Sequence, residues 1–171
     1  PENPDYLEEA RRRLIFEELL ILQLGLEKMR SQTQKNAGAV IERDFSDEYF
    51  SLLPFSPTGA QRRAVKEAMR DMMSGRQMNR LLQGDVGSGK TAVAAALVYS
   101  AAKNSMQSAL MAPTEVLAEQ HYKTFLKLFE GCGIKVERLT GSDTAAQKRR
   151  KKEALRAGDI DLLIGTHAII Q

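Results

Sequence analysis

Residues 84–91 read Gly84-Asp85-Val86-Gly87-Ser88-Gly89-Lys90-Thr91. We call this octet the P-loop, because it matches the phosphate-binding pattern Gly-x-x-x-x-Gly-Lys-Ser/Thr. Its glycines let successive backbone N–H groups turn inward and form a cradle for an anion. The Lys90 ammonium suits the β- and γ-phosphates of a nucleotide, and the Thr91 hydroxyl is a ligand for Mg²⁺. The octet therefore predicts binding of a nucleoside triphosphate, ATP or a relative, together with Mg²⁺.

The segments on either side of the P-loop agree with this interpretation. Residues 78–83 form a short apolar stretch, Met-Asn-Arg-Leu-Leu-Gln, which predicts a buried strand. The alanine-rich run 92–102 predicts a helix whose N-terminus faces the phosphates. A glycine-rich turn without a ligand is the alternative, and the strand–loop–helix context argues against it.

Strand and helix signals alternate through the rest of the chain. Thr58 is a candidate N-cap for a helix that ends at Ser74-Gly75. Further strands are expected at 108–111, 134–139 and 160–164, with helices at 115–129 and 144–157. This alternation predicts an α/β fold with a parallel sheet covered by helices on both faces.

The first 57 residues have a different character. Residues 6–34 contain no proline, and apolar residues recur there at alternating spacings of three and four, which predicts one long helix. This helix contains three consecutive arginines, Arg11, Arg12 and Arg13. They are expected to contact either phosphate or neighbouring glutamates, and we favour pairing with the glutamates. We divide the chain into a long linker helix (1–36), an irregular connector (37–57) containing Pro54 and Pro57, and a partial α/β lobe (58–171).

Composition limits the class of protein. Hydrophobic residues make up 43% of the 171 residues, and no apolar run is long enough to span a membrane. The single cysteine, Cys132, cannot form an internal disulfide, which fits a reducing cytosol. A net charge of +3 is mildly favourable for contact with nucleic acid. With no tryptophan and 6% aromatic residues, such contact is expected at the backbone of a strand and not at its bases.

Small polar residues follow three of the expected strands. These residues are Pro113 and Thr114, then Thr140, Gly141 and Ser142, then Gly165, Thr166 and His167. Because the carboxyl ends of parallel strands meet at one edge of a sheet, they predict a row of phosphate contacts for DNA. Ordinary turn chemistry is the alternative for each junction. The basic run 148–152, Lys-Arg-Arg-Lys-Lys, is equally compatible with a DNA footprint and with a solvated helix face.

In this order, the motifs resemble helicase superfamily 2, and within it the RecG family of branch-migrating DNA helicases. The resemblance rests on residues 11–23, 53–61, 84–91, 112–121, 139–142 and 164–168, and so covers nearly the whole chain. It implies that residues 58–171 form the first RecA-like motor lobe, incomplete at its C-terminus. It also implies that Phe55 and Gln61 contact adenine, and that the three strand edges hold the tracked DNA strand by its phosphates.

The family's Asp-Glu box, its Ser/Thr-Ala-Thr motif, its second motor lobe and its wedge domain are missing from this sequence. We therefore expect a fragment of a longer, cytoplasmic and monomeric ATP-dependent DNA helicase that remodels forks and Holliday junctions. The fragment alone is expected to bind nucleotide at most and not to hydrolyse ATP. The alternatives are a translocase similar to the transcription-repair coupling factor, a non-hydrolysing nucleotide-binding module and a metabolic P-loop kinase.

Overall fold

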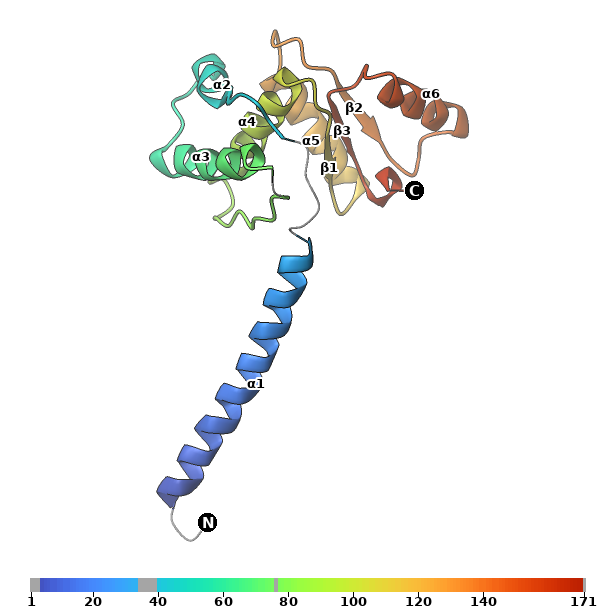
Figure 1. Cartoon of the computed structure of the whole chain (residues 1–171). Helices are drawn as coiled ribbons and strands as arrows, with labels where there is room; N and C mark the ends of the chain where they lie inside the picture. The colour runs from blue at the N-terminus through green and yellow to red at the C-terminus, as the bar shows by residue number, and fades with distance from the viewer. Residues whose placement is uncertain (1–3, 34–39, 76, 171) are drawn as a thin grey trace.

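The computed structural model describes residues 4–33, 40–75 and 77–170 (Figure 1). Three parallel strands form its sheet: β1 (Ser108–Met111), β2 (Val136–Leu139) and β3 (Leu162–Gly165), in the order β1-β3-β2. Ala109 of β1 and Glu137 of β2 both lie opposite Leu163 of β3. The parallel α/β architecture predicted from the alternating pattern is confirmed.

Helices cover both faces of this sheet. On one face, Leu162 and Ile164 of β3 join a core formed with α4 (Lys90–Lys103) and α5 (Glu115–Leu128). On the other face, Leu163 packs with α6 (Ala145–Arg156) and with Ile169 of the short 3₁₀ helix η1 (His167–Ile169). Successive residues of a strand point to opposite faces, so β3 contributes to both layers and is buried along its whole length.

The strand expected at residues 78–83 is not present. This segment has no regular secondary structure, and the Leu81 side chain is 90% exposed. A strand exists only through hydrogen bonds to a neighbouring strand, and among the described residues none pairs with this segment. Its apolar composition suited a buried strand, but composition alone supplies no partner.

The described part of the connector, residues 40–57, contains regular structure that its two prolines did not indicate. Residues 46–52 form a helix, α2 (Ser46–Leu52), which ends before Pro54. Tyr49 of α2 is fully buried, with its ring 5.2 Å from the ring of Tyr99 and 5.9 Å from that of Phe129. The prediction of an irregular segment throughout 37–57 was wrong for these residues, because burial of an aromatic side chain stabilises a helix of only seven residues.

The capping prediction for the helix after the connector is confirmed. α3 (Gly59–Met73) has Thr58 as its N-cap, with its hydroxyl accepting a hydrogen bond from the Gln61 backbone N–H at 3.2 Å. The Gln61 side chain completes the capping box by accepting from the Thr58 backbone N–H at 2.9 Å. Gln61, expected to contact a nucleotide, is thus also a structural residue of α3.

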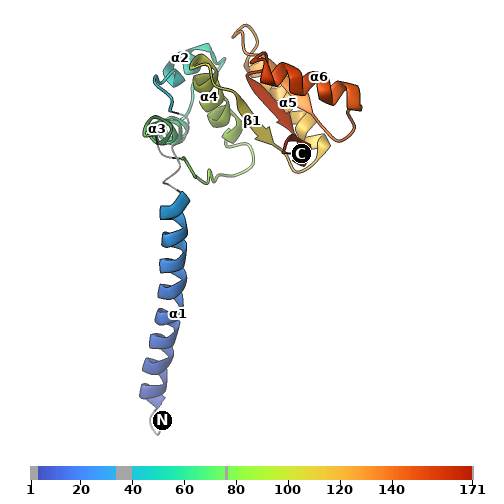
Figure 2. The same cartoon turned by 45° about the vertical axis from the view of Figure 1, so that its right-hand side comes forward.

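The expected N-terminal helix is α1 (Pro4–Thr33), and both views show it extending away from the lobe (Figure 1, Figure 2). Residues 6–29 are exposed, including the apolar stripe that predicted the helix. Arg12 pairs with Glu8 at 3.2 Å and Arg13 with Glu17 at 3.0 Å, which confirms the favoured pairing with glutamates for these two arginines. Within the described part of the chain, no helix is both long and apolar enough to cross a membrane.

The buried position of Tyr49 leads to a prediction about stability. Tyr49→Ala should lower the free energy of unfolding by about 3–5 kcal/mol, because it leaves a cavity between α2, α4 and α5. Tyr6→Ala is the matched control: Tyr6 is 66% exposed on α1, so its loss should change stability by less than about 0.5 kcal/mol. Urea unfolding of both variants tests this, and equal effects would show that α2 does not stabilise the lobe.

Candidate nucleotide and nucleic-acid site

The P-loop turns directly into the first residue of α4. Gly87 and Gly89 have φ angles of +83° and +80°, a region that side chains disfavour. Lys90 begins α4, and its ammonium donates to the carbonyl oxygens of Gly84 at 2.6 Å and Asp85 at 2.8 Å. A positive charge therefore lies inside the loop, at the N-terminus of a helix. Both features favour an anion such as phosphate at this position.

Gln61 connects α3 to the P-loop. Its side-chain amide donates to the carbonyl oxygen of Ser88 at 2.9 Å, while its amide oxygen accepts from the Thr58 N–H. A Cβ on Gly89 would lie 2.2 Å from the Gln61 side-chain nitrogen, so any other residue there would displace the Gln61 amide and would also be strained at the φ angle of +80°. Phe55, the other residue expected at adenine, is 47% exposed. Both polar groups of the Gln61 amide are thus occupied by the protein itself.

A second contact between α3 and the P-loop region was missed from the sequence. The Arg80 guanidinium contacts both carboxylate oxygens of Asp71 and also donates to Glu67 at 3.0 Å. The hydrogen bond from Arg80 is the main reason that the pKa of Asp71 is lowered. The available signal was an arginine within an apolar stretch, together with two acids spaced i, i+4 on the preceding helix.

The three strand edges meet as predicted. Met111 at the end of β1 and Leu139 at the end of β2 both lie opposite Gly165 at the end of β3. A Cβ on Gly165 would lie 1.9 Å from the Leu139 carbonyl oxygen, so this junction accommodates only glycine. We call the residues that follow the three strands, 113–114, 140–142 and 165–167, the sheet rim.

Several polar groups of the sheet rim already have partners within the protein. The Thr114 hydroxyl caps α5 by accepting from the Leu117 N–H at 3.3 Å. Thr140 is 1% exposed, and its hydroxyl lies 3.0 Å from that of Ser142. By contrast, Pro113, Gly141, Ser142 and His167 are exposed, and Thr166 is partly buried. Turn chemistry therefore accounts for the hydroxyls of Thr114 and Thr140, and the exposed members of the rim remain candidates for contact with a strand.

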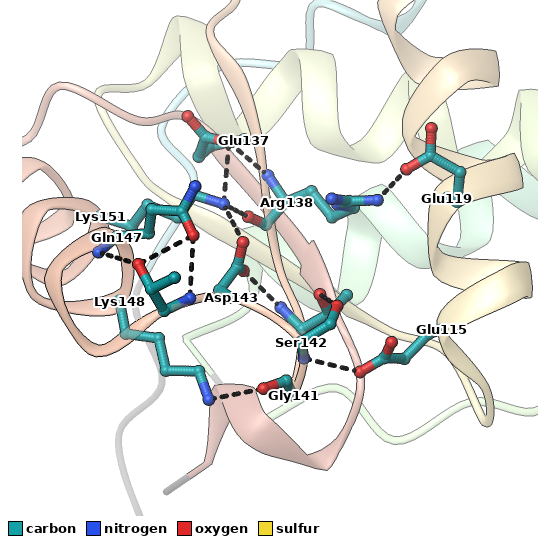
Figure 3. Close-up of polar contacts among 12 residues, drawn as sticks. Glu115, Glu119, Glu137, Arg138, Gly141, Ser142, Asp143, Gln147, Lys148 and Lys151 are labelled. Atoms are coloured by element: carbon teal, nitrogen blue, oxygen red, sulfur yellow. Dashed lines mark hydrogen bonds and ion pairs between the residues drawn. The ribbon is translucent and has the colours of Figure 1, made fainter.

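Residues 140–143 form a loop that is fixed by charged side chains (Figure 3). The Asp143 carboxylate accepts from the Thr140 N–H at 2.9 Å and pairs with Lys151 at 3.1 Å. Burial by itself raises the pKa of Asp143, but the Thr140 hydrogen bond and Lys151 outweigh it, so the pKa lies below its ordinary value of 3.8. From the opposite side, Glu115 accepts a hydrogen bond from the Ser142 N–H at 3.0 Å.

The basic run 148–152 divides between two environments. Lys148 donates to the Gly141 carbonyl oxygen at 2.9 Å, and Lys151 is largely buried beside Asp143, so both stabilise the loop. Arg149 pairs with Glu153 at 3.6 Å, whereas Arg150 and Lys152 are exposed on α6. The run is thus neither a uniform solvated face nor a uniform basic footprint.

The buried Asp143 contact predicts a pH-dependent stability. At neutral pH, Asp143→Asn should lower the free energy of unfolding by about 1.5–3 kcal/mol, because an ionised hydrogen-bond acceptor is lost. A folded-state pKa below the unfolded value gives stabilisation that is complete above about pH 4 and disappears as the pH falls further.

The difference in the free energy of unfolding between Asp143→Asn and the unchanged protein should therefore shrink on acidification below pH 4. Denaturant titrations between pH 3 and pH 7 measure it. Asp159→Asn, at a carboxylate whose side chain is 64% exposed, is the control and should have little effect at any pH. A difference that is constant across this range would contradict the lowered pKa.

Comparison with known proteins agrees with these features. The family model described as DEAD/DEAH box helicase matches residues 58–171. The ATP-dependent DNA helicases RecG of Thermotoga maritima and Bacillus subtilis are 46% identical over 97% of this chain and 45% identical over all of it. A solved structure of RecG bound to a three-way DNA junction is 46% identical over 96% of the chain, with a TM-score of 0.88.

The chain spans about a quarter of the length of these relatives: 22% and 26% of the two helicases, and 23% of the chain in the solved structure. The matched family model covers the P-loop and the entire sheet, the two features that define the site. The chain therefore belongs to the DEAD/DEAH box helicase family, and among its members it is similar to the RecG helicases.

Proposed function

We propose that this chain is the nucleotide-binding part of an ATP-dependent motor that moves along double-stranded DNA and remodels branched structures such as forks and Holliday junctions. The main support is the presence, in one lobe, of a P-loop and of three strand ends aligned at a single edge. The similarity to RecG helicases supports DNA as the track. We further propose that the intact protein is cytoplasmic and acts as a monomer.

The P-loop residues provide electrostatic stabilisation and position the phosphates. On nucleotide binding, Lys90 exchanges its contacts with the Gly84 and Asp85 carbonyl oxygens for the β- and γ-phosphates. The backbone N–H groups from Gly87 to Thr91 would bind the phosphate oxygens, and the Thr91 hydroxyl would hold Mg²⁺. A metal ion held there would supply positive charge to the phosphoryl oxygens.

Adenine is contacted by Phe55 and Gln61 in this proposal. The Gln61 amide can present a donor and an acceptor to the matching edge of adenine once it releases Ser88 and Thr58. Phe55 is sufficiently exposed to lie against the base. Because the same amide holds the P-loop before nucleotide binds, exchange of its partners links recognition of the base to the loop that holds the phosphates.

DNA lies along the sheet rim in this proposal. Small residues at the strand ends, together with the N-terminus of α5, offer neutral hydrogen-bond donors to a phosphate backbone. Such contacts carry little sequence information, which suits a motor that moves over any sequence. The sheet rim would have no function in a non-hydrolysing nucleotide-binding module or in a P-loop kinase, so its presence favours the DNA motor.

The role of Lys90 can be tested in the intact helicase. Lys90→Ala should reduce ATP turnover by about a hundredfold or more, because the positive charge that stabilises the transferred phosphate is lost. Binding of a DNA junction should persist. Lys66→Ala on α3, at an exposed lysine, is the control and should leave both unchanged. Turnover within a few-fold of the unchanged enzyme would remove the P-loop from the mechanism.

Nucleotide selectivity tests Gln61. Gln61→Ala should lower the ratio of kcat/KM for ATP to that for GTP by about tenfold or more, since the wrong base no longer leaves a buried amide unpaired. Gln61→Glu keeps the acceptor that caps α3 and removes the donor to Ser88. If both variants retain the selectivity of the unchanged enzyme, Gln61 serves only to cap α3 and hold the loop.

A further inference from the structure

A carboxylate occupies one of the backbone donors at which a DNA phosphate is expected. Glu115 is the first residue of α5, and its side chain accepts the hydrogen bond from the Ser142 N–H at 3.0 Å (Figure 3). The same oxygen lies 2.9 Å from the position of a Cβ on Gly141, so the carboxylate sits directly against the rim loop. Glu115 therefore joins two parts of the sheet rim, the ends of β1 and β2.

Glu115 differs from the other carboxylates nearby in having no cation beside it. Glu119 contacts Arg138 and Lys123, and Lys151 pairs with both Glu137 and Asp143. Among the residues that the structure describes, none with a positive charge lies within ion-pair distance of Glu115, and the ammonium of Lys148 is bound instead to the Gly141 carbonyl oxygen at 2.9 Å. No ion pair therefore balances its negative charge at the edge where DNA is proposed to bind.

A phosphate and a carboxylate compete for the same N–H group. Each is an anion that accepts a short, charge-assisted hydrogen bond, and one backbone donor serves one of them at a time. The Ser142 N–H also lies just before α6, and Glu115 lies in the first turn of α5, so both helix N-termini favour an anion at this position. In the absence of DNA, the Glu115 carboxylate fills that role.

We propose that Glu115 is a built-in competitor of the DNA phosphate, which must leave the Ser142 N–H before the strand can take its place. This inference rests on the proposed function, because it assumes that the strand follows the sheet rim. Displacement of Glu115 offsets part of the energy gained from the new phosphate contact, and so keeps that contact weak and easily reversed. A motor that releases and rebinds its track at each cycle requires contacts of this kind.

A purely structural role for Glu115 leads to the opposite expectation. If the carboxylate only holds the 140–143 loop in the conformation that binds DNA, its removal loosens the loop and weakens binding. If it competes with phosphate, its removal strengthens binding. The sign of the change in DNA affinity therefore decides between the two roles.

The experiment compares Glu115→Gln with Glu130→Gln in the intact helicase. Both variants lose one negative charge from the α5 region, but Glu130 is exposed just beyond the C-terminal end of that helix, far from the rim. The concentration of forked DNA that gives half-maximal stimulation of ATP hydrolysis should fall about fivefold for Glu115→Gln, because a charge-assisted competing hydrogen bond to the Ser142 N–H is replaced by a weaker neutral one. Glu130→Gln should leave it unchanged.

A second variant tests side-chain length separately from charge. It also keeps the proposal testable if Glu115→Gln folds poorly. Glu115→Asp keeps the charge and suits a helix N-terminus, but it is one methylene too short to hold the Ser142 N–H. It should show part of the gain in DNA affinity.

Unchanged or weakened DNA affinity in both folded Glu115 variants would contradict the proposal that Glu115 competes with a DNA phosphate. Failure of the proposed function is distinguishable, because the unchanged enzyme would then show no stimulation of ATP hydrolysis by DNA. Equal gains in Glu115→Gln and Glu130→Gln would also overturn the inference, since they would reflect overall charge and not the contact with Ser142.

Discussion

The parallel pairing of β3 with β1 on one side and β2 on the other is the constraint on which the rest of the lobe depends. Because the three strands end in register at Gly165, their loops emerge at the same edge. Because β3 is buried on both faces, its alternate side chains anchor α4 and α5 on one side and α6 on the other. The position of the rim thus follows from strand pairing before any polar contact at the rim is considered.

Features governed by local chemistry were predictable from the sequence. The P-loop, the Thr58 cap and the alternation of strands and helices depend on residues close together in the chain, and the structure contains each of them. Features that require a distant partner were not predictable. The helix at 46–52 needs Tyr99 and Phe129, which lie far along the chain, and residues 78–83 lack the neighbouring strand that their composition suited.

The same distinction applies within the site. Gly84 to Thr91 could be proposed as a phosphate site from the sequence alone, because glycine, lysine and threonine at this spacing suit a phosphate group whatever the rest of the chain does. Charged side chains gave no such signal: Glu115, Asp143 and Arg80 acquire their roles from partners that only folding brings near. The rim was correctly expected at one edge, but the sequence did not indicate that a carboxylate would lie on it.

The two contacts between α3 and the P-loop region together hold the loop against one rigid helix. Gln61 in the first turn of α3 holds Ser88, and Asp71 near its end holds Arg80, so one helix fixes the loop and the segment leading into it. These two residues are ten positions apart, about 15 Å along a helix axis. Inserting or deleting one residue between them would rotate one contact by about 100° relative to the other. This stretch of α3 is therefore far less tolerant of changes in length than its exposed surface suggests.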